Sequence, residues 1–374
     1  MSWRETTLGE ITDLKRGFDL PKSQRLQGDV PVYSSSGITG SNSTAAVEGP
    51  CVITGRYGTI GEVFFSGGPC WPLNTALYST EFNGNNPRFI YYLLQTIPWQ
   101  GYTTASAVPG VNRNHVNLCP VKIPDRATQD AIVEVLDSIV DKIALNNRLN
   151  DYLANLCETI ASRYCNDRNS RLRDICYQVA DHVDYDNANQ ETYVSTESLM
   201  QNKGGRQLAS SLPATGKITR YKAGDTLISN IRPYFKKIWY APFEGTCSGD
   251  VIVFRANDPS NAPYLHACLR QDSFFDYVMQ GAKGTKMPRG DKKQMMEFKV
   301  ASSCSTKDLI LLDSAIKQRS DNDSETVKLQ ALRDTLLPKL MSGEIDVSKV
   351  DLTQLTNNHL AGRMHWSNVI RVRA

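Results

Sequence analysis

The segment TQDAIVEVLDSIVDKIALNNRLNDYLANLCETIASRY, residues 128–164, decides how this chain folds. It repeats a seam of mostly apolar positions at alternating intervals of four and three residues, as a coiled-coil helix does. The seam comprises Ile132, Leu136, Ile139, Ile143, Asn146, Asn150, Leu153, Cys157 and Ile160. At 1.5 Å per residue, these 37 residues form a helix about 55 Å long, far beyond the average globular helix. The pattern predicts one long helix beginning near Asp125, a suitable N-cap after Pro124.

Two seam positions are occupied by asparagines, Asn146 and Asn150. One interpretation is that the helix leaves its partner here, so that both amides are solvated. The other is register control, because a polar residue in a coiled-coil seam costs stability but penalises misaligned pairings. The sequence leaves both interpretations open.

An internal repeat organises the chain. Val135–Ser138 is echoed by Leu311–Ser314 at an interval of 176 residues, and the same interval relates Leu153 to Leu329, Leu156 to Leu332 and Ile160 to Leu336. Upstream the match is looser but keeps its order. Val52-Ile53 before Arg56 parallels Leu227-Ile228 before Arg232, Asn86–Phe89 parallels Asn261–Tyr264, and Val108–Gly110 parallels Met287–Gly290. A duplication predicts a second long helix over Thr306–Leu337, ended by Pro338 because proline cannot continue a helix interior.

Each half divides into a strand-rich part and a long helix. The runs CVIT (51–54), GEVFF (61–65) and TALYST (75–80) predict strands, and FIYYLLQ (89–95) is a short helix or a buried strand. The predicted class is α+β: two repeated mixed α/β domains separated by two long antiparallel coiled-coil helices with a pseudo-two-fold relation. The globular parts would lie at opposite ends of a helical rod. The boundaries expected are 1–124, 125–168 for the first helix, 169–304, 305–350 for the second helix, and a tail of unknown role at 351–374.

Composition excludes several classes of protein. A net charge of +3 with 22% charged residues excludes a highly charged disordered chain. Nine cysteines without a C-x-x-C pair and five isolated histidines predict no metal site. Neither a nucleotide P-loop nor a G-x-S-x-G nucleophile elbow occurs. No signal peptide and no apolar run of membrane-spanning length is found, so we expect a cytoplasmic protein with no membrane partner.

Basic residues gather in two short segments of the second half. Lys217–Lys237 holds six basic residues against Asp225, and Lys283–Lys293 holds five against Asp291. Such clusters suit contacts with DNA phosphates, and Arg or Asn beside them suits base edges; a merely solvated basic face is the alternative. The candidate DNA-binding residues are Arg56, Tyr57, Asn74 and Arg113 in the first half and Arg220, Lys222, Asn230, Arg232, Tyr234, Lys236, Lys237, Lys283, Lys286 and Arg289 in the second.

Three groups of residues resemble the specificity subunit of Type I restriction-modification enzymes. LQALRDTLLPKLMSGEIDV (329–347) is similar to the end of that family's second long helix. PVKIP (120–124), with QDAI (129–132) and NNRL (146–149), is similar to its central helix. YVSTESLMQNKGG (193–205), GDTLISNIRPYFKKIWYA (224–241) and CSGDVIVF (247–254) resemble a common second target-recognition domain. The stretch from Val300 lacks the family's proline and glutamine, which leaves the start of the second helix undetermined.

The resemblance implies a chain that is not an enzyme by itself. Its two target-recognition domains would each read one half of a bipartite double-stranded DNA target. The helices would dock two modification (methyltransferase) subunits in an adenine-methylating complex that restriction subunits join. S-adenosylmethionine, ATP and Mg are then expected on the partner subunits, and no cofactor on this chain. The expected seam and docking residues are Leu136, Ile139, Ile143, Asn146, Leu153, Leu329, Leu332 and Leu336. The alternatives are a standalone DNA-binding or nuclease protein and a coiled-coil scaffold that binds no DNA.

Overall fold

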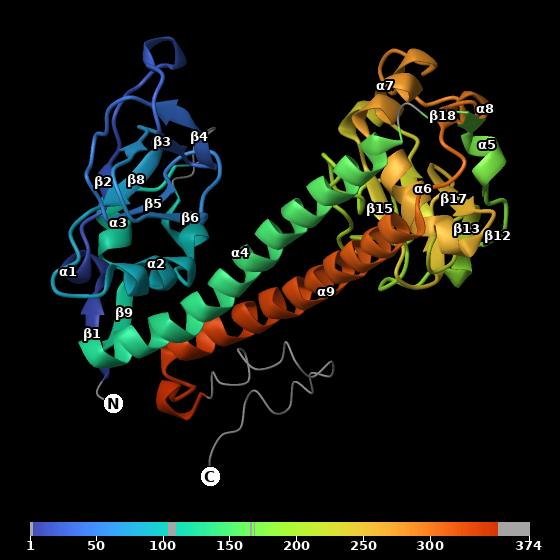
Figure 1. The fold of residues 1–374 in the computed structure, drawn as a ribbon. Coiled ribbons are helices and arrows are strands. Elements are labelled where there is room, and N and C mark those ends of the chain that lie inside the picture. Colours follow the sequence, from blue (N-terminus) through green and yellow to red (C-terminus); the bar gives the residue numbers. More distant parts are fainter. Residues whose placement is uncertain (1–2, 104–109, 165–166, 168, 351–374) are drawn as a thin grey trace. The chain divides into compact units, whose positions relative to one another are not determined.

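The computed structural model describes residues 3–103, 110–164, 167 and 169–350 (Figure 1). Its contacts divide the chain into two compact units, Met1–Ile143 with Val327–Ala374, and Ala144–Thr326. Two long helices, α4 (Arg126–Arg163) and α9 (Thr306–Ser342), each contribute one part to each unit. We call the first unit domain 1 and the second domain 2. Val108, Pro109, Cys165 and the tail from Asp351, which entered the sequence analysis, lie outside the described residues.

Domain 1 is built on short strands. A four-stranded antiparallel sheet has the order β2-β8-β5-β6, a three-stranded sheet has the order β4-β3-β7, and β1 pairs with β9. The central strand β5 is buried at all five residues, which suits its β-branched Val52, Ile53 and Thr54. The elements are β1 (Trp3–Thr7), α1 (Leu8–Ile11), β2 (Lys15–Arg16), η1 (Lys22–Gln24), β3 (Val30–Ser34), β4 (Gly37–Asn42), β5 (Cys51–Gly55), β6 (Val63–Ser66), β7 (Trp71–Pro72), β8 (Ala76–Ser79), α2 (Pro87–Gln95), η2 (Trp99–Tyr102), α3 (Arg113–Asn117) and β9 (Pro120–Pro124), with η7 (Val347–Lys349) after α9.

Domain 2 repeats this plan. Its four-stranded sheet has the order β11-β17-β14-β15, its three-stranded sheet the order β12-β13-β16, and β10 pairs with β18. Its elements are β10 (Ser170–Arg171), α5 (Leu172–Ile175), β11 (Cys176–Gln178), β12 (His182–Asp184), η4 (Tyr185–Asn187), β13 (Lys217–Tyr221), β14 (Thr226–Ser229), η5 (Pro233–Phe235), β15 (Ile238–Tyr240), β16 (Gly245–Cys247), β17 (Val251–Ala256), η6 (Pro259–Asn261), α6 (Ala262–Leu269), α7 (Asp272–Gln280), α8 (Lys292–Met295) and β18 (Lys299–Val300).

The duplication inferred from the sequence is therefore confirmed in the topology. In both domains a short helix follows the first strand. That first strand pairs with the last strand before a long helix: β1 pairs with β9 before α4, and β10 pairs with β18 before α9. The motifs around Asn86 and Asn261 begin the equivalent helices α2 and α6. FIYYLLQ is thus helical, with Asn86 accepting hydrogen bonds from the first turn of α2. The predicted α+β class, with repeated mixed domains and two long helices, is confirmed.

The seam of α4 is buried as its spacing predicts. Asp125 caps the helix by accepting a 3.0 Å hydrogen bond from the Thr128 amide. In domain 1, Ile132, Leu136 and Ile139 share one core with Leu329, Leu332, Leu336 and Leu340 of α9, and Ile143 packs against it. In domain 2, Cys157 and Ile160 share a core with Leu312, Ala315 and Ile316, and Leu153 packs against it. Each domain therefore includes packed segments of both helices.

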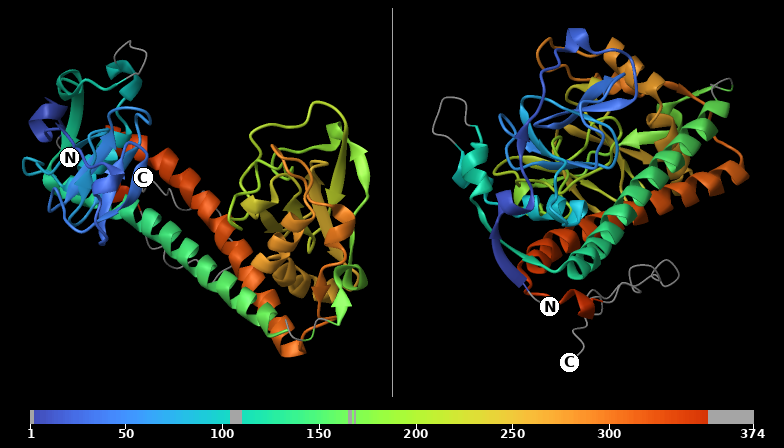
Figure 2. Two further views of the ribbon diagram at one scale, coloured as in Figure 1. Left: turned by 90° about the horizontal axis from the view of Figure 1, so that it is seen from above. Right: turned by 90° about the vertical axis from the view of Figure 1, so that its left-hand side faces the viewer.

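Within domain 2 the two helices run antiparallel. Asn146 contacts Glu325 and Thr326, Asn150 contacts Asn322 and Asp323, and Arg163 forms an ion pair with Asp308 at 3.2 Å. The residue numbers of the partners on α9 therefore decrease as the residue numbers on α4 increase. Figure 2 shows the end of α4 beside the start of α9. Asn146 and Asn150 are only 2% and 8% exposed, so the interpretation of both as solvated positions is wrong.

The predicted end of the second helix is wrong. Pro338 lies inside α9, which continues to Ser342. Proline has no amide hydrogen, so the carbonyl of Asp334, four residues earlier, lacks its helical hydrogen bond. Asp334 is exposed, and water can bind this carbonyl instead. Beyond Pro338, Leu340 and Met341 are 0% and 5% exposed, and burying each contributes about 1.5–3 kcal/mol, comparable with the ~3 kcal/mol cost of an interior proline. The helix ends instead at Ser342, and the next residue, Gly343, has a φ of +76°, the left-handed conformation that commonly follows a helix C-terminus.

Candidate nucleic-acid interface

Three of the four candidates in domain 1 converge on one surface hollow. Arg56, Tyr57 and Arg113 line a space of about 490 Å³. Its other lining residues are Arg16, Leu77, Gly110, Val111, Asn112 and Asn114. Arg16 and Arg113 are exposed and Arg56 is partly exposed, so three guanidinium groups face solvent around one concavity.

Two loops that are distant in sequence build this hollow. One follows β5 and the other precedes α3. The Val111 amide donates a 2.9 Å hydrogen bond to the Arg56 carbonyl, and Tyr57 forms an antiparallel bridge with Gly110. A side chain at residue 110 would place its Cβ 2.3 Å from the Tyr57 ring, so only glycine permits this approach. Asn112 caps α3 through a 3.0 Å bond from the Asn114 amide. We call residues 56–57 and 110–114 the bridged loops of domain 1.

Aromatic and acidic neighbours orient the arginines of domain 1. The Arg56 guanidinium lies 4.6 Å from the centre of the Tyr57 ring, a cation–π contact that restricts this side chain. Asp19 forms an exposed ion pair with Arg16 at 3.4 Å and accepts a hydrogen bond from the Asn74 amide group. Asn74, the fourth candidate, therefore acts on Asp19 in this structure and is not among the residues lining the hollow.

Domain 2 contains a second pair of bridged loops at the equivalent place. One follows β14, the strand that occupies the position of β5, and the other precedes α8. Gly290 donates to the Asn230 carbonyl at 3.3 Å, Arg232 donates to the Pro288 carbonyl at 2.8 Å, and Ile231 bridges Arg289. Asp291 caps α8 as Asn112 caps α3. Residues 230–232 and 288–291 are the bridged loops of domain 2.

The side chains of this second pair differ in exposure. Asn230 is 7% exposed, and its Oδ1 is buried. Arg232 adopts the left-handed conformation, φ 50°, which few residues other than glycine adopt. Arg289 has an exposed side chain that pairs with Asp250 at 3.1 Å, and Lys283 pairs with Asp291 at 3.4 Å. The two basic segments of the sequence thus meet here through residues 231–232 of the first and residues 288–289 of the second.

The neighbouring candidates are Tyr234 and Lys286. Tyr234 lies on η5 with its ring 46% exposed and 4.7 Å from the Phe235 ring. Lys286 is exposed in the loop between α7 and α8, close in sequence to Arg289. Both side chains are therefore accessible beside the second bridged loops.

Lys236 and Lys237 are used in internal contacts. Lys236 pairs with Asp272 at 2.8 Å, and Asp272 also binds Lys203, which reaches Glu158 of α4 at 2.9 Å. The two lysines hold the pKa of Asp272 below its usual range. Lys237 donates to the Thr196 carbonyl at 2.6 Å, and burial lowers its pKa.

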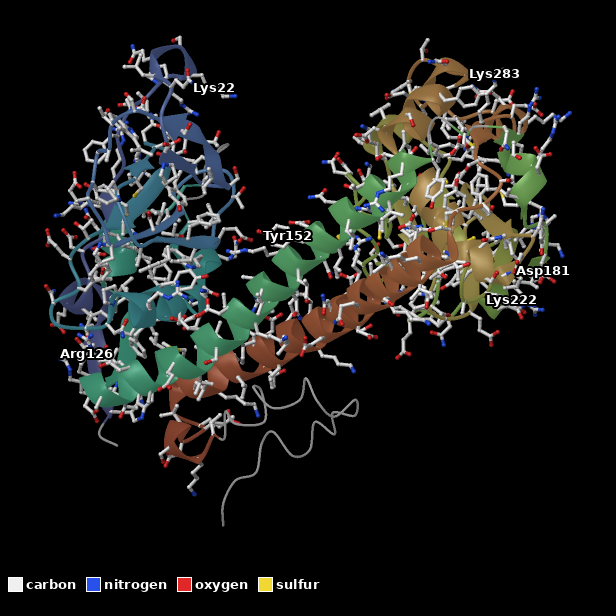
Figure 3. All side chains as sticks on the ribbon, in the orientation of Figure 1. Lys22, Arg126, Tyr152, Asp181, Lys222 and Lys283 are labelled. Atoms are coloured by element: carbon white, nitrogen blue, oxygen red, sulfur yellow. The ribbon has the colours of Figure 1, made fainter. Side chains whose placement is uncertain are left out.

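Arg220 and Lys222 lie elsewhere in domain 2. They line a separate hollow of about 580 Å³ with Asp181 and Glu244, and β13 belongs to a different sheet from β14. Figure 3 shows Lys222 beside Asp181 and well away from Lys283. The carboxylates in this hollow reduce its positive potential, which makes it a poorer phosphate site. The cluster Lys217–Lys237 is contiguous in sequence but not on the surface.

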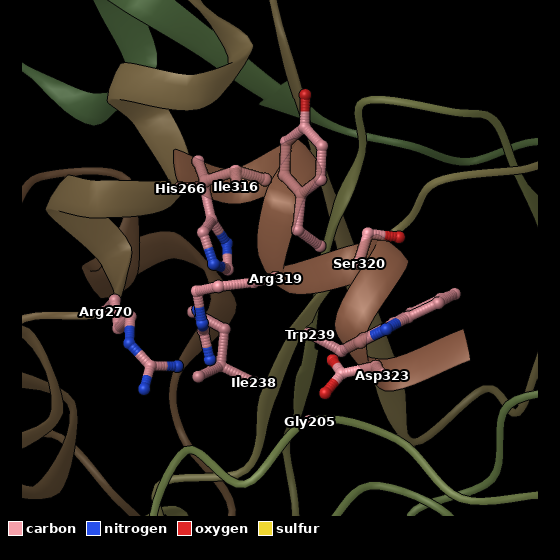
Figure 4. Close-up of a pocket in the computed structure, with 10 residues that line it drawn as sticks. Gly205, Ile238, Trp239, His266, Arg270, Ile316, Arg319, Ser320 and Asp323 are labelled. Carbon is pink, nitrogen blue, oxygen red and sulfur yellow. The ribbon is translucent and has the colours of Figure 1, made fainter. Parts of the chain in front are cut away.

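A small polar cavity of about 30 Å³ lies within domain 2 between α6, β15 and α9 (Figure 4). It is lined by His266, Arg270, Arg319 and Asp323, among others. Burial lowers the pKa of His266 well below 6.5, and burial also lowers the pKa of Arg270 to about 10. The space is large enough for an ordered water. His266 shares a 3.2 Å hydrogen bond with Thr226, and Arg270 pairs with Glu158 at 3.3 Å, so these groups have structural partners.

Sequence reasoning missed four residues at these surfaces. Arg16, Asn112 and Asn114 line the hollow of domain 1, and Asp250 holds Arg289. Only Asn112 carried a usable signal, because asparagine is one of the residue types preferred at a helix N-cap. Among the described residues, no group of three or more His, Cys, Asp or Glu side chains could hold a metal ion. None of the helices described is long and apolar enough to cross a membrane.

Comparison with known proteins agrees with this architecture. Residues 1–155 match the family model of the Type I restriction modification DNA specificity domain. The chain is 19% identical over 354 residues to the Type I restriction enzyme EcoDI specificity subunit of Escherichia coli, covering 80% of this chain and 77% of that protein. The crystal structure of a Type-I restriction-modification system S subunit from M. genitalium has a similar fold, with a TM-score of 0.62 at 15% identity, covering 91% of this chain and 96% of that one. The resemblance found in the residues is thereby confirmed: residues 1–155 match the DNA specificity domain of Type I restriction-modification enzymes, and most of the chain is similar to a specificity subunit of such an enzyme.

Proposed function

We propose that the chain binds double-stranded DNA through the bridged loops of both domains, each domain reading one half of a bipartite target. The observation that carries this proposal is the recurrence of the same site. Each domain joins the loop after the third strand of its four-stranded sheet to the loop before a short capped helix, and each presents exposed arginine there. Exposed arginine suits contacts with the phosphate backbone and also suits base edges.

The contribution of this chain is binding and not chemistry. Methyl transfer to adenine and DNA cleavage would belong to the modification and restriction subunits, which would hold S-adenosylmethionine, ATP and Mg. Each domain would supply binding free energy for its own half-site, and the sum would exceed the free energy of non-specific binding by several kcal/mol. The complex would therefore act where both half-sites occur at the required spacing.

An exposed apolar stripe on α4 supports the docking of modification subunits on the helices. Leu145, Leu149, Tyr152 and Leu156 are 55%, 37%, 65% and 39% exposed. Their spacing of four, three and four residues repeats the heptad pattern beside the buried seam. Four apolar side chains along one helical face are unfavourable in water, and a helical partner that covers them would remove that cost. The stripe therefore fits a helix of a modification subunit.

Mapping of methylated bases tests the proposed function. The genome of a host that carries the chain with its modification subunits should contain methylated adenines in a two-part motif, and deletion of this chain should remove them. Purified chain without partners should bind duplex DNA with strong salt dependence and should neither methylate nor cleave it. Methylation that persists after the deletion would contradict the proposal. Duplex cleavage by the chain alone would favour a standalone nuclease, and an absence of DNA binding would favour a scaffold.

A further inference from the structure

We infer that Arg56 and Arg289 are the principal base-reading residues of domain 1 and domain 2, respectively. This inference rests on the proposed function and adds to it which side chains specify sequence. Both arginines lie in the bridged loops, where backbone hydrogen bonds join two chain segments. The ligand at each position is the guanine of a G·C pair, whose N7 and O6 acceptors match the fork of a guanidinium group.

Hydrogen bonding, and not sequence alignment, establishes which residues are equivalent. The Arg56 carbonyl accepts from Val111, the residue before the cap of α3. The Asn230 carbonyl accepts from Gly290, the residue before the cap of α8. Arg56 therefore corresponds to Asn230, and the parallel drawn from sequence between Arg56 and Arg232 is displaced by two residues. By the same register, Gly110 corresponds to Arg289.

At these two corresponding positions, each domain has one arginine and one small or buried residue. The loop that carries the arginine differs between the two domains. In domain 1 the arginine is Arg56, on the loop after β5, next to Tyr57, which bridges the glycine of the other loop. In domain 2 the arginine is Arg289, on the loop before α8, while Asn230 is buried. A base edge approaching either bridge would meet one restrained guanidinium group, that of Arg56 or of Arg289, at a fixed place on the fold.

Both guanidinium groups are held before any ligand arrives. Arg56 lies against the Tyr57 ring, and Arg289 is paired with Asp250. A restrained side chain loses less conformational entropy when it forms a bidentate contact. Arg113 and Lys286 are exposed and have neither kind of restraint from the residues that the structure describes, so they suit phosphate contacts, which position the protein without reading sequence.

The remaining basic candidates do not specify bases. Lys236 and Lys237 are bound to Asp272 and the Thr196 carbonyl, and Arg220 and Lys222 share their hollow with two carboxylates. These four residues therefore contribute charge alone. Of the two arginines in the bridged loops of domain 2, Arg232 is only partly exposed and Arg289 is exposed, so specificity is assigned to Arg289.

Selection from a randomised duplex library tests this assignment. The full chain in complex with its modification subunits is incubated with the library, and bound duplexes are sequenced. Arg56→Lys keeps the charge but loses the fork, so it should relax one G·C position in one half of the motif about 5- to 150-fold, the range for a bidentate contact. Arg289→Lys should relax one G·C position in the other half only. Lys222→Ala is the matched control in the second basic surface and should leave both halves of the motif unchanged.

The outcomes separate this inference from the proposed function. If the wild-type complex selects no motif, the proposed function fails. If it selects a motif that Arg56→Lys and Arg289→Lys leave unchanged, or that Lys222→Ala relaxes, the inference is overturned while the proposed function stands. If one substitution relaxes both halves together, the assignment of one arginine to each half is wrong. Thermal unfolding of each variant verifies that it is folded.

Discussion

Asn322 donates a hydrogen bond of 2.8 Å to Asn150 across the helix pair of domain 2, and both side chains are at least nine-tenths buried. Asn150 in turn donates to Asp323 at 2.7 Å. A shift of one heptad along α9 would place Asn150 opposite Ala315 and Ile316, where its amide would find no side-chain partner, or opposite Leu329 and Gln330, where Leu329 could not replace the bond from Asn322. An unsatisfied buried amide costs about 1–3 kcal/mol. The polar layer therefore penalises misaligned pairings, as the register-control interpretation predicted.

Asn150→Ala should lower the stability of domain 2 by about 1–3 kcal/mol, because it leaves Asn322 and Asp323 without this partner. Thermal unfolding followed by circular dichroism measures the effect. Asn147→Ala, three residues earlier and exposed, is the control and should change stability by less than about 0.5 kcal/mol. The double variant with Asn322→Ala should lose less than the sum of the two single variants. Additive losses would show that the two amides do not interact.

Stability should fall as pH falls below about 6.5 because of His266. Burial holds the pKa of its imidazole well below 6.5 in the folded protein. Below pH 6.5 the unfolded chain therefore binds a proton that the folded chain does not, and unfolding gains up to about 1.4 kcal/mol per pH unit from this group. Above pH 6.5 the group contributes no pH dependence.

Unfolding free energies of the wild type and His266→Asn between pH 7.5 and 5.5 give the measurement. The variant should be less stable throughout but should depend less steeply on pH. Equal slopes for the wild type and His266→Asn would mean that the buried ring takes up its proton over the same pH range in the folded and unfolded chains, which would contradict the lowered pKa.

Local patterns in the sequence predicted elements better than they predicted surfaces. The heptad spacing located α4 and its buried positions, and the duplicated motifs around Asn86 and Asn261 located equivalent helices. The prediction that Pro338 ends the second long helix is wrong because burial of Leu340 and Met341 outweighs the local cost of proline in a helix interior. The internal repeat located the loop segments in each half, but their contact had no signal, since Arg56 and Val111 meet through backbone atoms that leave no residue pattern. Residues of the basic segment Lys217–Lys237 lie on different surfaces because Lys222 and Arg232 flank strands of different sheets, a separation that sequence proximity cannot predict.

The exposed stripe on α4 should be required for assembly but not for folding. Leu149→Ala combined with Tyr152→Ala removes apolar surface that is 37% and 65% exposed, so the melting temperature should change little. Co-purification with the modification subunit should weaken at least tenfold, because central apolar residues contribute most to interface energies. Leu136→Ala is the opposite control: it should destabilise domain 1 by about 2–5 kcal/mol, because Leu136 is fully buried. Unchanged co-purification would place the docking surface elsewhere.

The salt dependence of DNA binding should identify phosphate contacts. Arg113→Ala and Lys286→Ala should each reduce the slope of log affinity against log salt concentration by about 0.9, the value for one phosphate contact on B-DNA. Lys236→Ala should leave the slope unchanged, because Lys236 is paired with Asp272. A reduced slope for Lys236→Ala would mean that this ion pair opens on DNA.

Exchange of domain 1 tests whether the two readers are separable. Residues 1–124 would be replaced by the equivalent segment of a relative, and the methylated sites mapped in cells that contain the modification subunits. Base contacts made by Arg56 and by Arg289 share no side chains, so their contributions should be nearly additive. One half of the motif should change while the other half and the gap between them persist. The exchange is structurally demanding, because Ile132 and Leu136 of α4 and Leu340 of α9 belong to the core of domain 1. A foreign segment must therefore present apolar side chains of similar volume to them, and thermal unfolding of the chimera distinguishes a lost core from a changed reader. A folded chimera in which both halves of the motif change together would contradict the model of two independent readers.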